Sequence, residues 1–327
     1  MAELITIGEP LVLFASNEEG VSLEEATSFS KYLAGAEINV AIGLTRLNHK
    51  VDYVSVIGND PFGGFLKKAI KKGNIDTKYL FISDKYPTGC MFKSKTSDGD
   101  PSTFYLRKGS AASHMTGNII DKIKLDGLQW AHITGILPGI LESSEVIDKL
   151  LEKLKKANIS VSFDPNLRPT IWSSKESMIK NITSIAKKAD LVMPGIKEGR
   201  ILTGEEDPES IARKFFEQSL TTKTVIIKMG PEGAMIFERD KDGYVLVPGF
   251  KVDKVIDTVG AGDGFAVGVL SGILEKKPLY EAVKRGNAIG AMAVMSPGDN
   301  DGYPDPSMLD DFLKKQGKSN AESRFIK

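Results

Sequence analysis

Three small residues followed by a carboxylate form the part of this sequence best suited to chemistry. Gly260, Ala261 and Gly262 precede Asp263, and the apolar stretch that follows predicts that this run opens a helix. The first backbone amides of a helix have no partners within it and lie at the positive end of its dipole, so they can bind an anion. Glycine lets a phosphate approach such a backbone closely.

A carboxylate beside a phosphate site needs a function, because the two negative charges repel each other. Asp263 is placed to accept the proton of an attacking hydroxyl group during phosphoryl transfer. The alternative is that Asp263 only caps a glycine-rich turn, since Asp is a common N-cap residue and glycine patterns are frequent. The rest of the chain has to decide between the two interpretations.

The composition is typical of a globular protein with one large domain or two unequal ones. The chain has 327 residues, of which 43 are basic, 43 are acidic and 41% are hydrophobic. A net charge of zero offers no basic surface for nucleic acid. We therefore predict a small molecule as partner, and no nucleic acid.

The cysteine and histidine content and the hydropathy bear on the cellular compartment, on metal binding and on membrane association. Cys90 is the only cysteine, so no internal disulfide can form, and the three histidines have no partner at metal-ligand spacing. The sequence starts with a strand-like segment without a basic leader, and no apolar run approaches the roughly 20 residues that span a bilayer. These observations predict a cytoplasmic protein without a zinc site or a membrane partner.

Short apolar segments alternate with longer segments of helical periodicity. This alternation predicts a mostly parallel sheet with helices on both faces, and ligands bind such sheets at the carboxyl ends of the strands. The predicted strands are residues 4–7, 53–57, 130–134, 159–163, 191–193, 224–228 and 234–237. The predicted helices are residues 38–47, 62–72, 144–157, 175–189 and 208–218, followed by a helical region over 263–294 in which Pro278 lies in the first turn of a second helix.

Two polar, turn-rich regions, residues 12–32 and 88–107, interrupt this alternation. We predict short strands there, outside the main sheet and paired into a small lid. A lid over the cleft would exclude water and protect a nucleotide from wasteful hydrolysis, whereas a plain surface hairpin is the alternative. Exposed strand edges of the lid also favour a homo-oligomer. Residues 1–315 are predicted to form the folded domain, and 316–327 a polar tail.

Residues 257–270 resemble, at every position, the second signature of the ribokinase-like (pfkB-type) carbohydrate kinases. Residues 35–39, 105–111, 164–168 and 228–233 are similar to further elements of that family, in the same order. Glu37 departs from the small residue usual at its position, and this variant resembles the 2-keto-3-deoxygluconate kinase branch. The resemblance implies a three-layer α/β/α fold with a small β-sheet lid. It also implies ATP and Mg²⁺ as cofactors, with a monovalent cation left open.

The resemblance implies specific roles around the phosphoryl group. Asp263 would be the catalytic base, and residues 260–262 would form an anion hole. The Glu of the family's Asn-x-x-Glu element organises the water shell of the metal; Glu198 matches it, although Gly195 replaces the Asn. The residues implied to contact the nucleotide are Asn166, Arg168, Lys228, Gly230, Gly233, Gly260, Ala261, Gly262 and Asn287.

Arg107 and Arg168 bear on the identity of the acceptor. A guanidinium group matches a carboxylate, and a neutral sugar offers nothing that needs two of them, so we predict a clamp on an acid group. Each arginine could instead be solvated or bind a phosphate. The remaining implied substrate contacts are Gly35, Ala36, Asn39, Met91, Tyr105, Asp263 and Asp299, where Met91 replaces a frequent Tyr and Asp299 suits an Asx-turn equally well.

The implied reaction is transfer of the γ-phosphoryl group of ATP to the terminal hydroxyl of 2-keto-3-deoxygluconate, which gives the 6-phosphate. A 5-dehydro-2-deoxygluconate kinase and a fructokinase are alternatives within the family. A sugar-acid-binding regulator on the same fold is the alternative outside enzymes. A dinucleotide-dependent dehydrogenase does not fit, because residues 7–10 lack a glycine fingerprint after the first strand.

Overall fold

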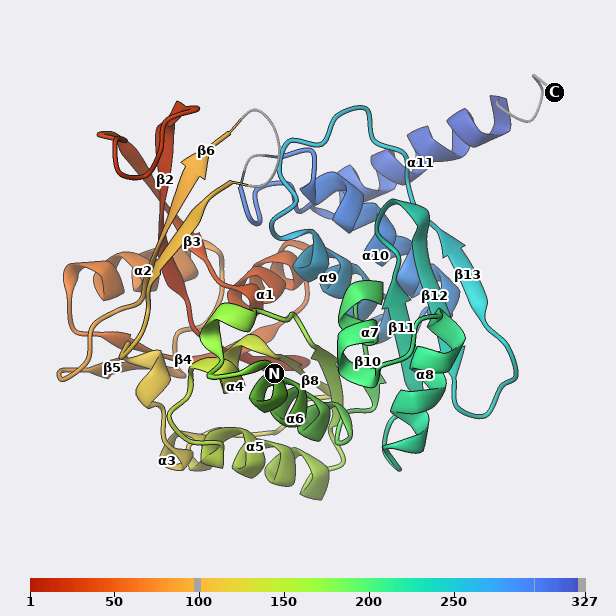
Figure 1. Cartoon of the computed structure of the whole chain (residues 1–327), viewed down its shortest axis with the longest axis horizontal. Helices are drawn as coiled ribbons and strands as arrows, with labels where there is room; N and C mark the ends of the chain where they lie inside the picture. The colour runs from red at the N-terminus through yellow and green to blue at the C-terminus, as the bar shows by residue number, and fades with distance from the viewer. Residues whose placement is uncertain (97–100, 297, 323–327) are drawn as a thin grey trace.

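A large sheet forms the centre of the computed structural model, which describes residues 1–96, 101–296 and 298–322. Within these residues the sheet has the strand order β13-β12-β11-β10-β9-β8-β1-β4-β5. The strands from β5 to β11 in this order pair in parallel, and β12 and β13 pair antiparallel at one edge. Figure 1 shows β12 and β13 on the right. The bounds are β1 Leu4–Ile7, β4 Val51–Gly58, β5 Leu80–Ser83, β8 Trp130–Thr134, β9 Ser160–Asp164, β10 Leu191–Val192, β11 Thr224–Lys228, β12 Gly233–Glu238 and β13 Val245–Pro248.

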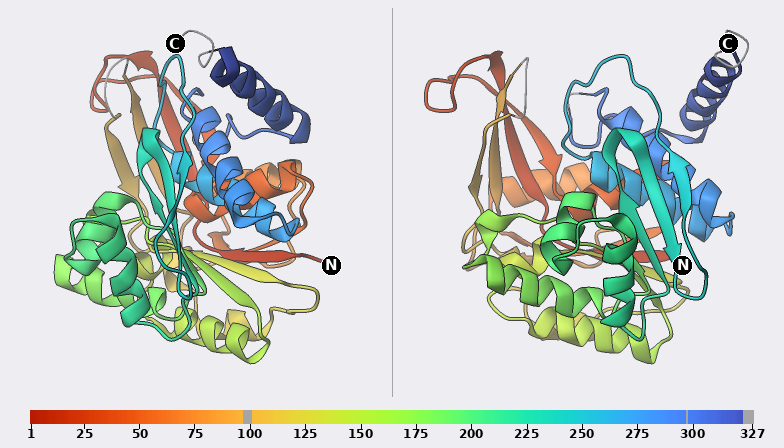
Figure 2. Two further views of the ribbon diagram at one scale, coloured as in Figure 1. Left: turned by 90° about the vertical axis from the view of Figure 1, so that its right-hand side faces the viewer. Right: turned by 45° about the vertical axis from the view of Figure 1, so that its right-hand side comes forward.

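Helices cover both faces of the sheet, each burying an apolar stripe against it. One face carries α1 Ala36–Arg46, α2 Pro61–Lys72, α9 Ala261–Leu274 and α10 Leu279–Ala293, with α11 Pro306–Glu322 packed on α10. The other face carries α3 Gly117–Asp121, α4 Ile136–Ile140, α5 Glu145–Lys156, α6 Lys175–Ala186, α7 Ile196–Thr203 and α8 Pro208–Glu217. The predicted three-layer α/β/α fold is therefore confirmed (Figure 2).

A second sheet stands apart from the main one, and because the segments predicted to form a lid build it, we refer to it as the lid. Its strand order is β3-β2-β6-β7, with β2 Leu11–Glu19, β3 Phe29–Ala34, β6 Cys90–Lys95 and β7 Thr103–Leu106. The β2–β3 and β6–β7 pairs are antiparallel, whereas β2 and β6 pair in parallel. Figure 1 shows this sheet projecting at the upper left, so both predicted lid segments contribute strands to it.

Several expected boundaries differ from the structure. Strands β5 and β13 were not predicted; each has four residues and lies at an edge of the sheet. Pro278 is the N-cap of α10 rather than a first-turn residue. The predicted tail partly belongs to α11, which continues to Glu322, and residues 323–327 lie outside the described residues. Leu309, Phe312 and Leu313 anchor α11 by packing against the core, which a polar sequence from residue 316 onward does not reveal.

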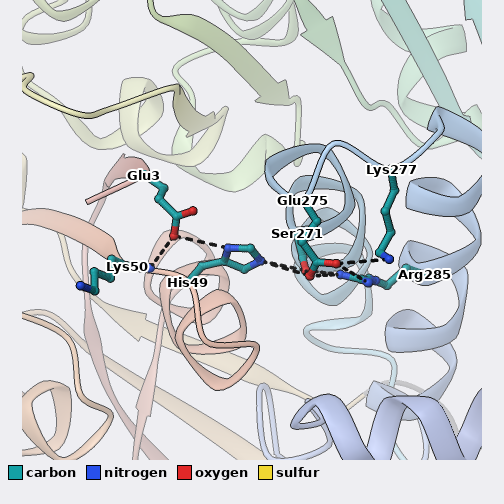
Figure 3. Close-up of polar contacts among 7 residues, drawn as sticks. All are labelled: Glu3, His49, Lys50, Ser271, Glu275, Lys277 and Arg285. Carbon is teal, nitrogen blue, oxygen red and sulfur yellow. Dashed lines mark hydrogen bonds and ion pairs between the residues drawn. The ribbon is translucent and has the colours of Figure 1, made fainter. Parts of the chain in front are cut away.

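A polar network joins the residues just before strands β1 and β4 to helices α9 and α10 (Figure 3). His49 Nδ1 lies 3.5 Å from Glu3 Oε2, and His49 Nε2 lies 3.1 Å from Ser271 Oγ. Arg285 Nη1 and Nη2 donate to the two carboxylate oxygens of Glu275 at 2.6 and 2.9 Å. These contacts tie the loop before β4 to the carboxyl end of α9 and to the middle of α10.

We expect Glu275→Gln to lower the free energy of unfolding at pH 7 by about 1 kcal/mol. The effect is this small because Glu275 is partly exposed and solvent screens its ion pair with Arg285. The hydrogen bond from Arg285 lowers the pKa of Glu275 to about 2, so the fold favours the ionised carboxylate. This contribution is complete above the unfolded pKa of about 4.5 and disappears as the pH falls towards 2. Urea unfolding at pH 7 and pH 3 measures it, with Glu209→Gln in an exposed helical pair as control. An equal loss at both pH values would contradict the assignment.

Candidate active site

A cavity of about 410 Å³ opens at the carboxyl ends of β1, β8, β9 and β11, beneath the lid. It is the place where parallel sheets bind ligands. Lid residues on β2, β3, β6 and β7 line it from above. The predicted site residues that line it are Gly35, Ala36, Asn39, Met91, Tyr105, Arg107, Asn166, Arg168, Glu198, Lys228, Gly260, Gly262, Asp263 and Asp299.

Asp263 lies in the first turn of α9 and is buried in this cavity. Asn39 Nδ2 donates to its Oδ2 at 2.9 Å, and Asn166 Nδ2 donates to its Oδ1 at 3.3 Å. Burial raises the pKa of Asp263 to about 7, although the hydrogen bond from Asn39 opposes this shift. A carboxylate oriented by two amides and titrating near neutral pH is well suited to act as a general base.

The glycine-rich turn before α9 is fixed by contacts on three sides. Gly260 has a φ of 81°, and a Cβ atom there would lie 1.8 Å from the carbonyl oxygen of Asp299. Tyr303 Oη donates to the Gly260 carbonyl at 2.6 Å, and Asp257 Oδ1 accepts from the Val259 amide at 3.0 Å. The first amides of α9 therefore have a set position next to Asp263, as an anion site requires.

Lys228 places a positive charge beside this turn. Its Nζ lies 2.7 Å from Asp164 Oδ2 and would be 3.7 Å from a Cβ atom on Gly262. Burial would lower the pKa of Lys228, but the nearby carboxylates of Asp164 and Glu198 outweigh this effect and raise it. The ammonium group therefore stays charged where phosphate oxygens would approach the turn.

The two predicted clamp arginines line the same cavity but differ in their surroundings. Arg107 Nε and Nη2 lie 2.7 and 2.6 Å from Glu9 Oε2, and Ser110 donates to the other oxygen of Glu9. Arg168 is exposed, and its Nη1 donates to the Leu167 carbonyl at 3.0 Å. Because a guanidinium group has five N–H donors, both arginines retain donors for a ligand.

Glu198 has a structural role in addition to the one implied by the resemblance. Its Oε2 accepts from the Gly195 amide at 2.7 Å and so caps α7. Its Oε1 accepts from the Leu167 amide at 2.7 Å and fixes the loop after β9. Each carboxylate oxygen has a further lone pair, so Glu198 still offers oxygen acceptors to the cavity.

Other predicted nucleotide contacts lie outside this cavity. Asn287 Nδ2 donates to the carbonyls of Val247 and Pro248 at 2.9 and 3.0 Å, so its amide fastens β13 to α10. Gly230 and Gly233 flank the turn between β11 and β12, where both have positive φ angles. Ala261 begins α9 next to the cavity without lining it.

Some site residues were not predicted from the sequence. Glu9 is 2% exposed and pairs with Arg107, although a carboxylate directly after the first strand could have indicated it. Asn300 Nδ2 donates to Asn39 Oδ1 at 2.8 Å, so it sets the orientation of the Asn39 amide. Glu37 accepts from Thr134 Oγ1 at 2.5 Å, and burial raises its pKa to about 7.

The model of the pfkB family carbohydrate kinases matches residues 1–306. The chain belongs to this family. A 2-dehydro-3-deoxygluconokinase of Bacillus subtilis (strain 168) is 42% identical over 316 residues, which cover 96% of each sequence. The PfkB protein from Polaromonas sp. JS666 has a TM-score of 0.85 and 41% identity, with 95% of this chain and 99% of that chain covered. A putative ribokinase II from E. coli, solved with ATP and Mg²⁺, has a TM-score of 0.86, 24% identity, and coverage of 96% and 100%.

Family membership settles the class of this pfkB kinase. It is a sugar kinase with a ribokinase-like fold, in agreement with the resemblance of residues 257–270. Within the three ranges that the structure describes, no helix is long and apolar enough to cross a membrane.

Proposed function

We propose that this pfkB kinase transfers the γ-phosphoryl group of ATP to the terminal hydroxyl of 2-keto-3-deoxygluconate, also named 2-dehydro-3-deoxygluconate, and forms the 6-phosphate. The observation that supports it most is that Arg107 and Arg168 line the same cavity as Asp263. An acceptor with a carboxylate at one end and a hydroxyl at the other matches this arrangement. The relative that is 42% identical is a 2-dehydro-3-deoxygluconokinase, which supports the same acceptor.

In the proposed reaction, Asp263 acts on the acceptor and the turn acts on the phosphoryl group. The acceptor oxygen forms a bond to the γ-phosphorus as its proton passes to the Asp263 carboxylate, and ADP leaves with the electrons of the broken P–O bond. The first amides of α9 and the Lys228 ammonium stabilise the charge on the transferring group. Asn39 and Asn166 keep the carboxylate directed at the acceptor.

The donor set of the cavity fits Mg²⁺ and a nucleoside triphosphate. Carboxylates of Asp164 and Glu198 line it, and Mg²⁺ prefers oxygen ligands while keeping several waters and binding triphosphate oxygens. When bound, the ion neutralises charge on the triphosphate. A monovalent cation stays a prediction, which a comparison of activity in potassium and tetramethylammonium salts tests. A homo-oligomer formed through the lid also stays a prediction, which light scattering after gel filtration tests.

The decisive experiment measures ADP release with ATP and Mg²⁺ across a panel of acceptors. The panel contains 2-keto-3-deoxygluconate, its galactonate epimer, 5-dehydro-2-deoxygluconate, fructose and ribose. We expect the highest kcat/KM for 2-keto-3-deoxygluconate. If fructose or 5-dehydro-2-deoxygluconate had the highest kcat/KM, the proposed acceptor would be wrong. Binding of a sugar acid without any turnover would favour the regulator instead.

We expect Arg168→Ala to raise the KM for the sugar acid at least about tenfold while changing the KM for a neutral acceptor little, because a charge-assisted pair to the carboxylate is lost. Arg107→Ala alone would leave Glu9 buried without its partner. The matched variant is therefore Arg107→Met combined with Glu9→Gln, for which we expect the same selectivity. Steady-state kinetics with both acceptors measure the effect, and an equal loss for the neutral acceptor would contradict the clamp.

A further inference from the structure

A lysine of the lid lies buried between two carboxylates near the glycine-rich turn. Lys93 is on β6, and its side chain is 6% exposed. Its Nζ contacts Asp257 Oδ2 and lies 3.3 Å from Asp299 Oδ1. The side chains of Asp257 and Asp299 are 7% and 6% exposed, so water and salt screen the three charges little.

Both carboxylates belong to the segments that shape the turn. Asp257 accepts a hydrogen bond from the Val259 amide through its other oxygen, so it fixes the start of the turn. The backbone of Asp299 packs so closely on Gly260 that no Cβ atom fits between them. Lys93 is therefore a contact from the lid to both segments that set the position of the turn.

The positive charge of Lys93 holds the two negatively charged side chains of Asp257 and Asp299 together. Two buried carboxylates that share one ammonium group repel each other as soon as it is withdrawn. Such a buried ion pair is weak evidence for net stability, since the desolvation of the charges offsets their attraction. Its clear consequence is geometric, because it holds β6 of the lid and residues 257 and 299 at one separation.

We propose that Lys93 is a positioning residue that couples closure of the lid to the geometry of the glycine-rich turn. This inference rests on the proposed role of that turn in phosphoryl transfer. With the lid over the cavity, the ammonium group draws Asp257 and Asp299 together and the turn adopts its ordered form. When the lid lifts, Lys93 leaves with β6 and the carboxylates separate. The turn is then ordered for transfer only while the lid excludes water from the cavity.

Lys95 offers a matched control for this proposal. It is two residues further along β6 and therefore on the same face of the lid. Its ammonium group lies 3.9 Å from Glu19, and both side chains are more than half exposed, at 54% and 53%. Lys95→Met removes a lid lysine of the same strand without touching the turn.

Hydrogen exchange of the protein without substrates tests the coupling directly. In Lys93→Met, we expect peptides covering residues 90–95 and 257–262 both to exchange at least about tenfold faster, because local opening becomes easier in both segments. Lys95→Met should leave the 257–262 peptide unchanged. Faster exchange confined to residues 90–95 in Lys93→Met would overturn the proposal. If this variant does not fold, Lys93→Gln with Asp299→Asn keeps polar groups without two unpaired charges, and the same outcomes apply.

Kinetics with the best acceptor of the wild-type protein provide the second readout. We expect Lys93→Met to lower kcat at least about tenfold with the KM for ATP changed little. A tenfold loss of kcat corresponds to about 1.4 kcal/mol of transition-state stabilisation. Propylammonium should restore part of the kcat of Lys93→Ala by replacing the missing charge. A kcat within about twofold of wild type in Lys93→Met overturns the proposal. Because the exchange experiment needs no acceptor, failure of the proposed substrate leaves this test intact.

Discussion

Asp263→Asn is expected to lower kcat at least about 100-fold, because general-base catalysis typically contributes about 10²–10⁴-fold and an amide cannot accept the proton. The affinity for ATP should change little, since Asp263 is placed for the acceptor rather than for the nucleotide. Burial of the carboxylate is unfavourable, so thermal unfolding of the variant should not begin at a lower temperature. Steady-state kinetics and calorimetry measure the two effects.

The alternative interpretation of Asp263 as a plain N-cap is wrong, because Gly260 is the N-cap of α9 and Asp263 lies within the first turn. Asp207 accepts a hydrogen bond from the Ser210 amide as a plain N-cap of α8, so Asp207→Asn is the matched control with unchanged kcat. Near-normal turnover in Asp263→Asn would contradict its role as the catalytic base. The pH profile gives a second check: with a pKa of about 7, kcat/KM should rise with pH through neutrality and level off above it.

Gly260→Ala is expected to have the second large effect, a loss of at least about 100-fold in kcat, as found when a preorganised anion-stabilising donor is removed. Gly260 has a positive φ of 81°, and its added Cβ would lie 1.8 Å from the Asp299 carbonyl. The turn must therefore move, and the first amides of α9 move with it. Kinetics together with thermal unfolding measure the change.

Gly262→Ala is the matched control two positions further along, in the first turn of α9. An added Cβ there would meet only Lys228 Nζ, at an ordinary contact distance of 3.7 Å. The fold should tolerate it, so the unfolding temperature stays near that of the wild type while that of Gly260→Ala falls. If Gly260→Ala retained both its unfolding temperature and its kcat, the turn would not need the geometry described here.

The fold was largely predictable because its local patterns agree with its long-range pairing. Segments such as β11 Thr224–Lys228 and β8 Trp130–Thr134 match their predicted bounds, since their apolar runs are flanked by turn residues. Strand β13 escaped prediction because it is a short edge strand that ends at Pro248, and proline is unusual within strands. Backbone pairing with β12 stabilises β13 as a strand although its own sequence does not predict one.

The site was predictable only where a local pattern indicates a function. Asp263 was singled out because glycines before an apolar helix predict an anion site, and it does line the cavity, while its role as the base stays a prediction. Glu9 and Lys93 were missed because their ion pairs depend on partners from distant segments, Arg107 for Glu9 and Asp257 for Lys93. Asn287, which the resemblance implies as a nucleotide contact, donates to the backbone of β13, and its contact with a nucleotide stays a prediction. The contacts of these side chains depend on partners that are distant in the sequence, so a local sequence pattern does not reveal them.

The connectivity of the lid sets an order of events during folding. Its central pair joins β2 to β6, and the chain between them forms α1, β4, α2 and β5 of the main body. Closing so long a loop is entropically unfavourable until the intervening elements are formed, so this pairing belongs to the late steps. A refolding chain should therefore regain its helical circular dichroism before it regains turnover.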